Sequence, residues 1–165
     1  MPMMNPEPRP EHRWLHRMVG EWRATMECPG GPGQPASKAE SVEGVRSLGG
    51  LWVVAEGRGE MPGGGGPATT ILTLGYDPQK ARFVGTFVGS MMTVLWVYEG
   101  TLDAAGTVLT LDTVGPDFAA EGRMARYQDV IAFEGDDHRV MTSRMLGEDG
   151  AWHQVMRAEY RRVRG

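Results

Sequence analysis

Four histidines are the side chains of this sequence best suited to bind a metal ion or carry a proton. His12 and His16 are four residues apart, a spacing that places both imidazoles on one face of a helix. The segment between them, Arg13-Trp14-Leu15, lacks the glutamate that the helix of a metalloprotease carries. Because two ligands without a third nearby make a poor metal site, we interpret the pair as surface histidines. We expect no metal and no other cofactor.

Asp129 is an acidic residue whose position points to the interior of the protein. Along its segment it alternates with three apolar or aromatic residues, Tyr127, Ile131 and Phe133. A buried carboxylate must be hydrogen-bonded or paired, so we expect Arg144 or Arg126 to be its partner. Such a pair is more often structural than catalytic. The sequence also lacks the Gly-x-Ser-x-Gly motif of a hydrolase, and we favour a binding protein over an enzyme.

Aromatic and methionine side chains recur inside the apolar segments. Ligand pockets are mostly apolar and carry a few polar groups that orient the ligand. Asp129, Tyr98 and His153 are the polar groups that we expect in this role. The predicted pocket residues are Trp52, Phe87, Met92, Trp96, Tyr98, Asp129, Met141, His153 and Met156.

These side chains must be positioned by a short helix and a series of strands. Apolar residues at Trp14, Leu15, Met18 and Val19 predict a helix over residues 11–19, which Gly20 ends. From Gly20 onward the apolar period changes to two, as in a half-buried strand. About ten strands follow, joined by short turns rich in glycine, aspartate and proline. Their ranges are 21–28, 37–48, 51–56, 69–76, 82–88, 91–98, 107–114, 124–133, 139–146 and 152–163.

The strand pattern predicts an all-β fold, a closed antiparallel up-and-down barrel. No long helix separates the strands, which argues against parallel units, and closure removes the two unpaired edges of an open sheet. A barrel of about ten strands encloses a small cavity. We expect residues 1–10, with their four prolines, to be a disordered leader and residues 11–165 to form a single domain.

Composition restricts the partners of the chain. Lys and Arg number 17 against 21 Asp and Glu, for a net charge of −4, which gives no basic surface for nucleic acid. No stretch approaches the roughly 18 consecutive apolar residues of a membrane helix. Cys28 is the single cysteine, so an intrachain disulfide is excluded and a cytoplasmic location fits best.

Four short motifs resemble an uncharacterised bacterial family of lipocalin-like, or calycin-like, barrels. They are Gly20-x-Trp22, Leu74-Gly75-Tyr76-Asp77, Tyr98-Glu99-Gly100 and Met156-x-x-x-Tyr160-x-Arg162. The likeness covers residues 12–162 and implies a calycin-type barrel, but it brings no activity and no site residues. In lipocalins more widely the tryptophan of the first strand packs beside a basic residue near the last strand. This likeness implies that Arg162 or Arg161 lies over Trp22 and closes one end of the barrel.

Three functions remain open. The first is non-enzymatic binding of a small hydrophobic or amphipathic molecule inside the barrel, which we favour. The second is a haem-binding barrel that uses His153. Ten-stranded haem barrels place a proximal histidine on a late strand, and this chain resembles them in strand number and in carrying Gly-x-Trp on the first strand. Here Arg23-Ala24-Thr25-Met26 replaces the alternating glycines of those proteins. The third is a structural module, a homodimer whose barrel is filled by side chains.

Overall fold

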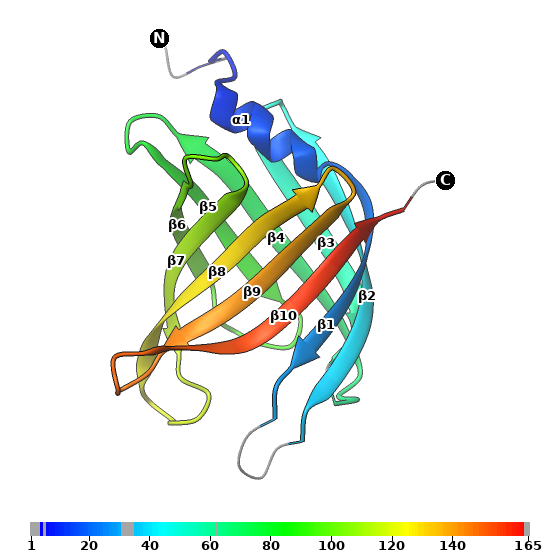
Figure 1. The fold of residues 1–165 in the computed structure, drawn as a ribbon, viewed down its shortest axis with the longest axis vertical. Helices are drawn as coiled ribbons and strands as arrows, with labels where there is room; N and C mark the ends of the chain where they lie inside the picture. Colours follow the sequence, from blue (N-terminus) through cyan, green and yellow to red (C-terminus); the bar gives the residue numbers. More distant parts are fainter. Residues whose placement is uncertain (1–3, 5, 31–34, 62, 164–165) are drawn as a thin grey trace.

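A computed structural model describes residues 4, 6–30, 35–61 and 63–163. Ten strands in this part of the chain close into one barrel, in which each strand pairs antiparallel with its neighbours in sequence and β1 pairs with β10 (Figure 1). The predicted closed up-and-down barrel is therefore confirmed. The strands are β1 (Gly20–Cys28), β2 (Ser37–Leu48), β3 (Trp52–Glu60), β4 (Pro67–Asp77), β5 (Arg82–Gly89), β6 (Trp96–Leu102), β7 (Val108–Pro116), β8 (Met124–Gly135), β9 (His138–Leu146) and β10 (Trp152–Arg162).

The N-terminal helix is shorter than the apolar pattern predicts. It comprises α1 (Pro10–Leu15) and one 3-10 turn, η1 (His16–Met18). Pro10 starts the helix, where its fixed φ is favourable and its missing N–H is not needed. Val19 is already extended, so the chain enters β1 directly. Within the expected leader, residues 1–3 and 5 lie outside the described residues, and the Pro8 carbonyl accepts a hydrogen bond from Arg13.

Three strand boundaries differ from the prediction by four residues or more. The strand predicted over residues 91–98 ends at Leu102 instead of Tyr98, and the other two differences lie near the end of the barrel opposite α1. β3 continues to Glu60 instead of ending at Glu56, because Gly57 and Gly59 leave room for the neighbouring strands, whose atoms a Cβ would meet. β6 begins at Trp96 instead of Met91. Residues 90–95 form a loop that begins with a turn, in which the N–H of Met92 donates to the carbonyl of Gly89.

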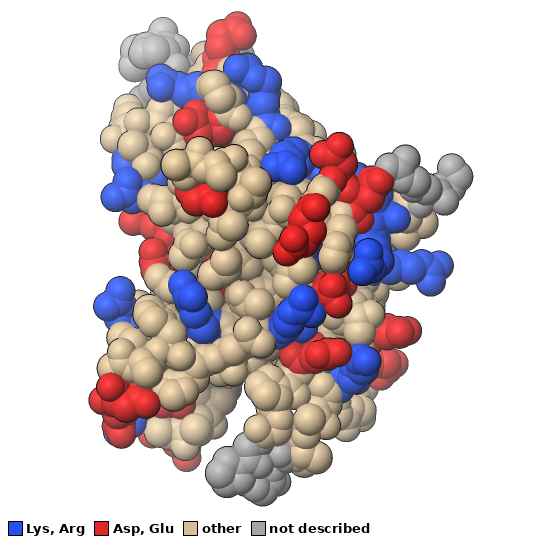
Figure 2. Space-filling model, in the orientation of Figure 1, with Lys and Arg blue, Asp and Glu red and all other residues tan. Residues whose placement is uncertain are grey.

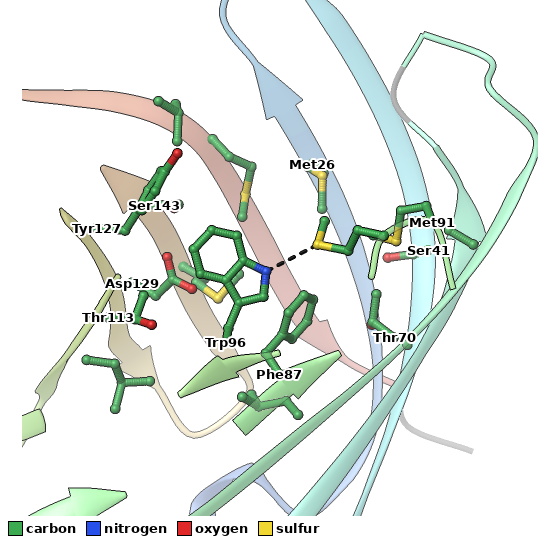
Figure 3. Close-up of a pocket in the computed structure, with 18 of the residues that line it drawn as sticks. Met26, Ser41, Thr70, Phe87, Met91, Trp96, Thr113, Tyr127, Asp129 and Ser143 are labelled. Atoms are coloured by element: carbon green, nitrogen blue, oxygen red, sulfur yellow. Dashed lines mark hydrogen bonds between the residues drawn. The ribbon is translucent and has the colours of Figure 1, made fainter. Parts of the chain in front are cut away.

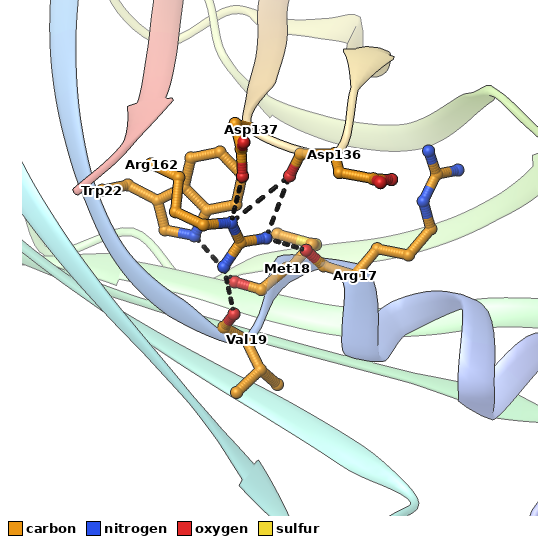
Figure 4. A network of polar contacts seen from close by, with 7 residues as sticks. All are labelled: Arg17, Met18, Val19, Trp22, Asp136, Asp137 and Arg162. Carbon is orange, nitrogen blue, oxygen red and sulfur yellow. Dashed lines mark hydrogen bonds and ion pairs between the residues drawn. The ribbon is translucent and has the colours of Figure 1, made fainter. Parts of the chain in front are cut away.

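Trp22 occupies the barrel end that lies under α1. Its side chain is fully buried, and its Nε1 donates to the carbonyl oxygen of Met18 at 2.8 Å. The guanidinium carbon of Arg162 lies 4.3 Å from the centroid of the indole (Figure 4). The sequence left Arg161 and Arg162 as alternatives for this place; Arg161 is exposed instead. A cation over an indole contributes about 0.5–2 kcal/mol.

The Arg162 guanidinium also ties the last strand to the segment between η1 and β1. It donates to the carbonyl oxygens of Val19 at 2.6 Å and Arg17 at 2.8 Å, and it pairs with the Asp137 carboxylate at 3.1 Å (Figure 4). Gly20 passes beside this group with a φ of +132°, and a Cβ there would collide with the guanidinium. The Gly20-x-Trp22 motif therefore has a steric origin.

Apolar side chains of α1 and η1 complete the closure of this end. Trp14 makes edge contacts with Phe83 and Phe133, at centroid distances of 5.9 and 5.5 Å. Leu15 and Met18 are completely buried beneath it. In Figure 1 the helix lies across the upper end of the barrel. This end is a packed core, which we call the sealed end.

Charged side chains of both signs are interspersed on the face of the barrel drawn in Figure 2. They do not gather there into one basic patch. Among the described residues, no helix has the length and apolar character needed to cross a membrane.

Candidate ligand-binding cavity

A cavity of about 500 Å³ occupies the half of the barrel away from α1. Its wall is formed by inward-facing side chains of the strands and by three loops at the end opposite the sealed end. The wall is mainly apolar. Phe87 and Trp96 contribute to it (Figure 3), as do Leu111 and Ile131. Seven methionines also line it, Met26, Met61, Met91, Met92, Met141, Met145 and Met156. Their flexible, polarisable side chains can adapt to an irregular apolar ligand.

The mouth of the cavity lies between the loops that follow β3, β5 and β7. Met91 and Phe118 stand there with 38% and 71% of their surfaces exposed. Trp96 stands just inside, where its Nε1 donates to the Met92 sulfur at 3.1 Å and its ring meets Tyr127 edge-on at 5.1 Å (Figure 3). An aromatic and thioether surface therefore surrounds the entrance.

Asp129 lies on one wall of the cavity with two hydroxyl groups beside it. The Tyr98 hydroxyl donates to Oδ2 of Asp129 at 2.5 Å, and the hydroxyl of Ser143 is a second hydrogen-bond partner. The register explains the meeting, because Asp129 on β8 stands directly opposite Ser143 on β9. Tyr98 reaches it from β6. The three polar side chains thus form one cluster on an otherwise apolar wall.

Burial controls the protonation of this cluster. Removal from water raises the pKa of Asp129, and the hydrogen bonds from Tyr98 and Ser143 oppose that shift. Burial, followed by the proximity of Asp129, raises the pKa of the Tyr98 phenol. The phenol therefore stays protonated and remains the donor in this bond.

The expected arginine partners of Asp129 are placed elsewhere. Nε of Arg144 donates to Gln128 at 2.8 Å, and its guanidinium lies over Trp152 at 5.5 Å. Arg126 is exposed. Arg126 and Gln128 have the opposite strand phase from Asp129, and Arg144 stands opposite Gln128, so these side chains project from the outer face of the barrel. The inward direction of Asp129 agrees with the sequence pattern, but the expectation of an arginine partner was wrong.

Thr113 of β7 is a further polar residue of the same wall. It is 7% exposed, and its hydroxyl is one of two buried side-chain polar atoms without a hydrogen-bond partner among the described residues. Thr113 stands opposite Tyr127 in the register, one inward position from Asp129. Figure 3 shows the side chains of Thr113 and Asp129 next to each other. A buried hydroxyl without a hydrogen-bond partner lowers the stability of the folded chain.

A buried ion pair separates the cavity from the sealed end. The guanidinium of Arg139 donates to the carboxylate of Glu43, and both side chains are almost completely buried. Arg139 also lies between two rings, at 4.6 Å from Trp22 and 4.0 Å from Tyr160. Burial, with the Glu43 carboxylate next, raises the pKa of the Tyr160 phenol. Sequence reasoning missed this pair, although both residues share the strand phase of inward neighbours such as Val45 and Met141.

Seven of the nine predicted pocket residues line the cavity: Phe87, Met92, Trp96, Tyr98, Asp129, Met141 and Met156. Trp52 does not, because Val53 and Ala55 take the inward phase of β3 and the indole packs on Gly75 outside the barrel. His153 does not either. It stands at the beginning of β10, where its Nε2 lies 3.1 Å from the Asp149 carboxylate and its side chain is 54% exposed.

The two histidines His12 and His16 were expected at the surface, and the structure differs from this expectation at His12. His12 is buried, not at the surface: its Nδ1 accepts a hydrogen bond from the N–H of Arg9, and its Nε2 bonds to the carbonyl oxygen of Tyr76 at 3.0 Å. His16 contacts the hydroxyl of Ser47. Among the residues that the structure describes, no group of three or more His, Cys, Asp and Glu side chains could hold a metal ion.

Solved structures with the same fold include two that cover nearly the whole chain. The crystal structure of Rv2717c from M. tuberculosis has a TM-score of 0.65 and 13% identity, and the match covers 96% of this chain and 100% of that one. The S-type phycobiliprotein lyase CPES from Guillardia theta has a TM-score of 0.59 and 17% identity, with coverage of 96% and 99%. At these identities the likeness establishes the fold alone.

Sequence comparison identifies the family. None of the curated proteins matches the chain significantly. The model of one protein family, described as a protein of unknown function, DUF1579, matches residues 7–162. This agrees with the resemblance of the four motifs to an uncharacterised family of lipocalin-like barrels. The chain is a member of the DUF1579 family.

Proposed function

We propose that this barrel binds a small hydrophobic or amphipathic molecule in its cavity, without catalysing a reaction. The observation that carries the proposal is the contrast between its two ends. The sealed end is packed with buried side chains, whereas the other half holds a cavity of about 500 Å³ within a mainly apolar wall. That volume is in the range of small-molecule sites, about 300–1,000 Å³.

The wall also has the few polar groups that a selective site needs. Tyr98, Asp129, Ser143 and Thr113 lie together on one side, while aromatic and methionine side chains form most of the remainder. An amphipathic molecule could therefore place its polar end on this cluster and its apolar part against Phe87 and Trp96. The predicted residues Phe87, Met92, Trp96, Tyr98, Asp129, Met141 and Met156 are proposed contacts.

Native mass spectrometry of the freshly purified chain tests the proposal. We expect a population carrying a non-covalent small molecule, which denaturing conditions release. The matched control is the double variant Ser41→Phe/Thr70→Phe, in which two rings replace small side chains of the cavity wall. It should carry no such molecule. Equal retention by both proteins would place the molecule outside the cavity and contradict the proposal.

A haem held by His153 receives no support from the structure. The imidazole stands outside the cavity and contacts Asp149. A haem inside the barrel would therefore not meet this side chain. Titration with haemin followed by absorption spectroscopy should give the same spectrum for the wild type and for His153→Ala.

Self-association is a second candidate function, which the outer face of the barrel favours. Ile71 stands opposite Val88 in the register, and both are exposed, as is Val97 two strands along from Ile71. Exposed apolar patches often mark interaction sites. Light scattering over a dilution series is the test: a constant monomer mass would exclude a homodimer.

We propose a cytoplasmic location as well. Cys28 is free and half-buried, which is compatible with a reducing compartment. Cell fractionation with an antibody to the chain tests this, and recovery of the protein outside the cytoplasm would contradict it.

A further inference from the structure

The charges of the cavity wall discriminate between classes of ligand. Four acidic residues line it, Glu43, Glu60, Asp117 and Asp129, against two arginines, Arg58 and Arg139. Both arginines already have carboxylate partners, Glu56 for Arg58 and Glu43 for Arg139. The described wall therefore has an excess of negative charge, which would repel an anionic ligand such as a fatty acid.

Asp129 lies among apolar side chains of the cavity wall, and no basic side chain pairs with its carboxylate among the described residues. The side chains around it are the hydroxyls of Tyr98 and Ser143, with the Tyr160 phenol and the Glu43–Arg139 pair beyond them. A carboxylate has about four acceptor positions, and these two hydroxyls occupy two. The others can accept hydrogen bonds from a donor inside the cavity.

Thr113 provides an independent observation that points to a polar group of a ligand at this place. Its hydroxyl is buried, lines the cavity and has no partner within the described part of the chain. It lies beside Asp129 on the adjacent strand (Figure 3). A ligand with a polar group at Asp129 would reach this hydroxyl too, so one molecule would satisfy both residues.

We propose that the ligand is an apolar molecule with a protonated nitrogen, an amine or a protonated heterocycle, which donates hydrogen bonds to Asp129 and Thr113. This inference rests on the proposed function. The nitrogen restores the balance of charge beside the buried carboxylate. The apolar frame packs against Trp96, Phe87 and the methionines, toward the mouth.

Three probes with one aromatic frame test the charge preference by isothermal titration calorimetry at neutral pH. They are naphthylmethylamine, which is a cation, naphthylmethanol, which is neutral, and naphthoic acid, which is an anion. We expect the wild type to bind the amine about tenfold or more tightly than the alcohol, because the hydrogen bond to Asp129 is charge-assisted. The acid should bind most weakly.

Asp129→Asn should abolish the preference of the amine over the alcohol. The matched control is Asp112→Asn, which removes the same charge from an exposed residue on the outer face of β7 and should preserve the preference. Thr113→Val should weaken the amine about twofold to tenfold. An unchanged amine preference in Asp129→Asn would overturn the proposal.

The wild type alone also decides the question if Asp129→Asn fails to fold. Alcohol or acid binding as tight as the amine would overturn the inference and leave cavity binding intact. Failure of all three probes, together with no bound molecule in native mass spectrometry, would instead refute the proposed function itself.

Discussion

Asp129 is a buried acidic residue whose ionisation we expect to lower the stability of the fold. Burial raises its pKa above the ordinary 3.8. A carboxyl with a higher pKa in the folded state contributes stability that is complete below the unfolded pKa and is lost as pH rises through the folded pKa. We therefore expect Asp129→Asn to melt at a higher temperature than the wild type near pH 8, with the difference vanishing below pH 3.8.

Thermal denaturation across this pH range measures the effect. Asp112→Asn is the control, since its carboxylate is exposed and accepts a hydrogen bond from Gln128. It should show no comparable gain near pH 8. A lower melting temperature for Asp129→Asn at that pH would mean that the ionised carboxylate stabilises the barrel, contrary to our interpretation.

The Glu43–Arg139 pair gives a second prediction for single residues. Arg139→Met leaves Glu43 buried without its cation and removes the contacts with Trp22 and Tyr160. We expect a loss of about 3–5 kcal/mol in the free energy of unfolding, measured with urea. The double variant Glu43→Leu/Arg139→Met should recover much of it, because a well-packed apolar pair can replace a buried ion pair.

An exposed ion pair provides the comparison. Lys38 and Glu27 lie 3.5 Å apart with more than half of each side chain exposed, so Lys38→Met should cost less than about 1 kcal/mol. Equal losses in Lys38→Met and Arg139→Met would show that burial of the Glu43–Arg139 pair is energetically unimportant.

The direction of Asp129 could be predicted because strand residues two apart share a face, and Ile131 and Phe133 are apolar. Its partners could not be predicted, since Tyr98 and Ser143 come from other strands and meet it only through strand registers that the sequence does not specify. The same limit hid the Glu43–Arg139 pair. Trp52 was misplaced because Trp52, Val53 and Val54 are all apolar, so alternation does not fix their phase.

At the scale of elements, α1 and η1 cover one end of the barrel, which the pairing of β1 with β10 closes into a cylinder. Leu15 is 1% exposed and packs in the main core, although it lies in a helix of only six residues. Such a short helix is not stable alone and depends on this packing. We expect Leu15→Ala to lower the free energy of unfolding by about 2–5 kcal/mol, as measured by urea denaturation.

Leu48→Ala makes the same chemical change at a residue that is 60% exposed. It should cost less than about 0.5 kcal/mol. If the two alanine variants were equally stable, α1 would be a surface appendage and the sealed end would owe nothing to it.

The sequence predicted the number and order of these elements well, because short strands bounded by turn residues leave a clear period of two. It predicted their ends less well. Gly57 and Gly59 resemble turn residues, yet here they let β3 continue between β2 and β4. Met91 and Met92 resemble strand residues, yet they line the cavity mouth from a loop.

At the scale of the whole molecule, the packed core and the cavity that we propose as a binding site occupy opposite ends of one barrel. Trp22, Leu15 and Phe83 are buried in the sealed end, whereas small side chains such as Ser41 and Thr70 face the cavity. Close packing supplies most of the stability of a core. A cavity supplies little, since the atoms of its wall lack contacts on one side. Substitutions in the two halves should therefore have separable effects.

The cavity-filling variant Ser41→Phe/Thr70→Phe tests this separation. We expect its free energy of unfolding to be the same as that of the wild type or up to about 1 kcal/mol higher, because each ring buries apolar surface in existing space. Binding of naphthylmethylamine, measured by calorimetry, should be lost. Leu15→Ala should show the reverse, with lower stability and near-normal affinity below its melting temperature. Loss of both properties together in either variant would mean that the two ends of the barrel form one cooperative site.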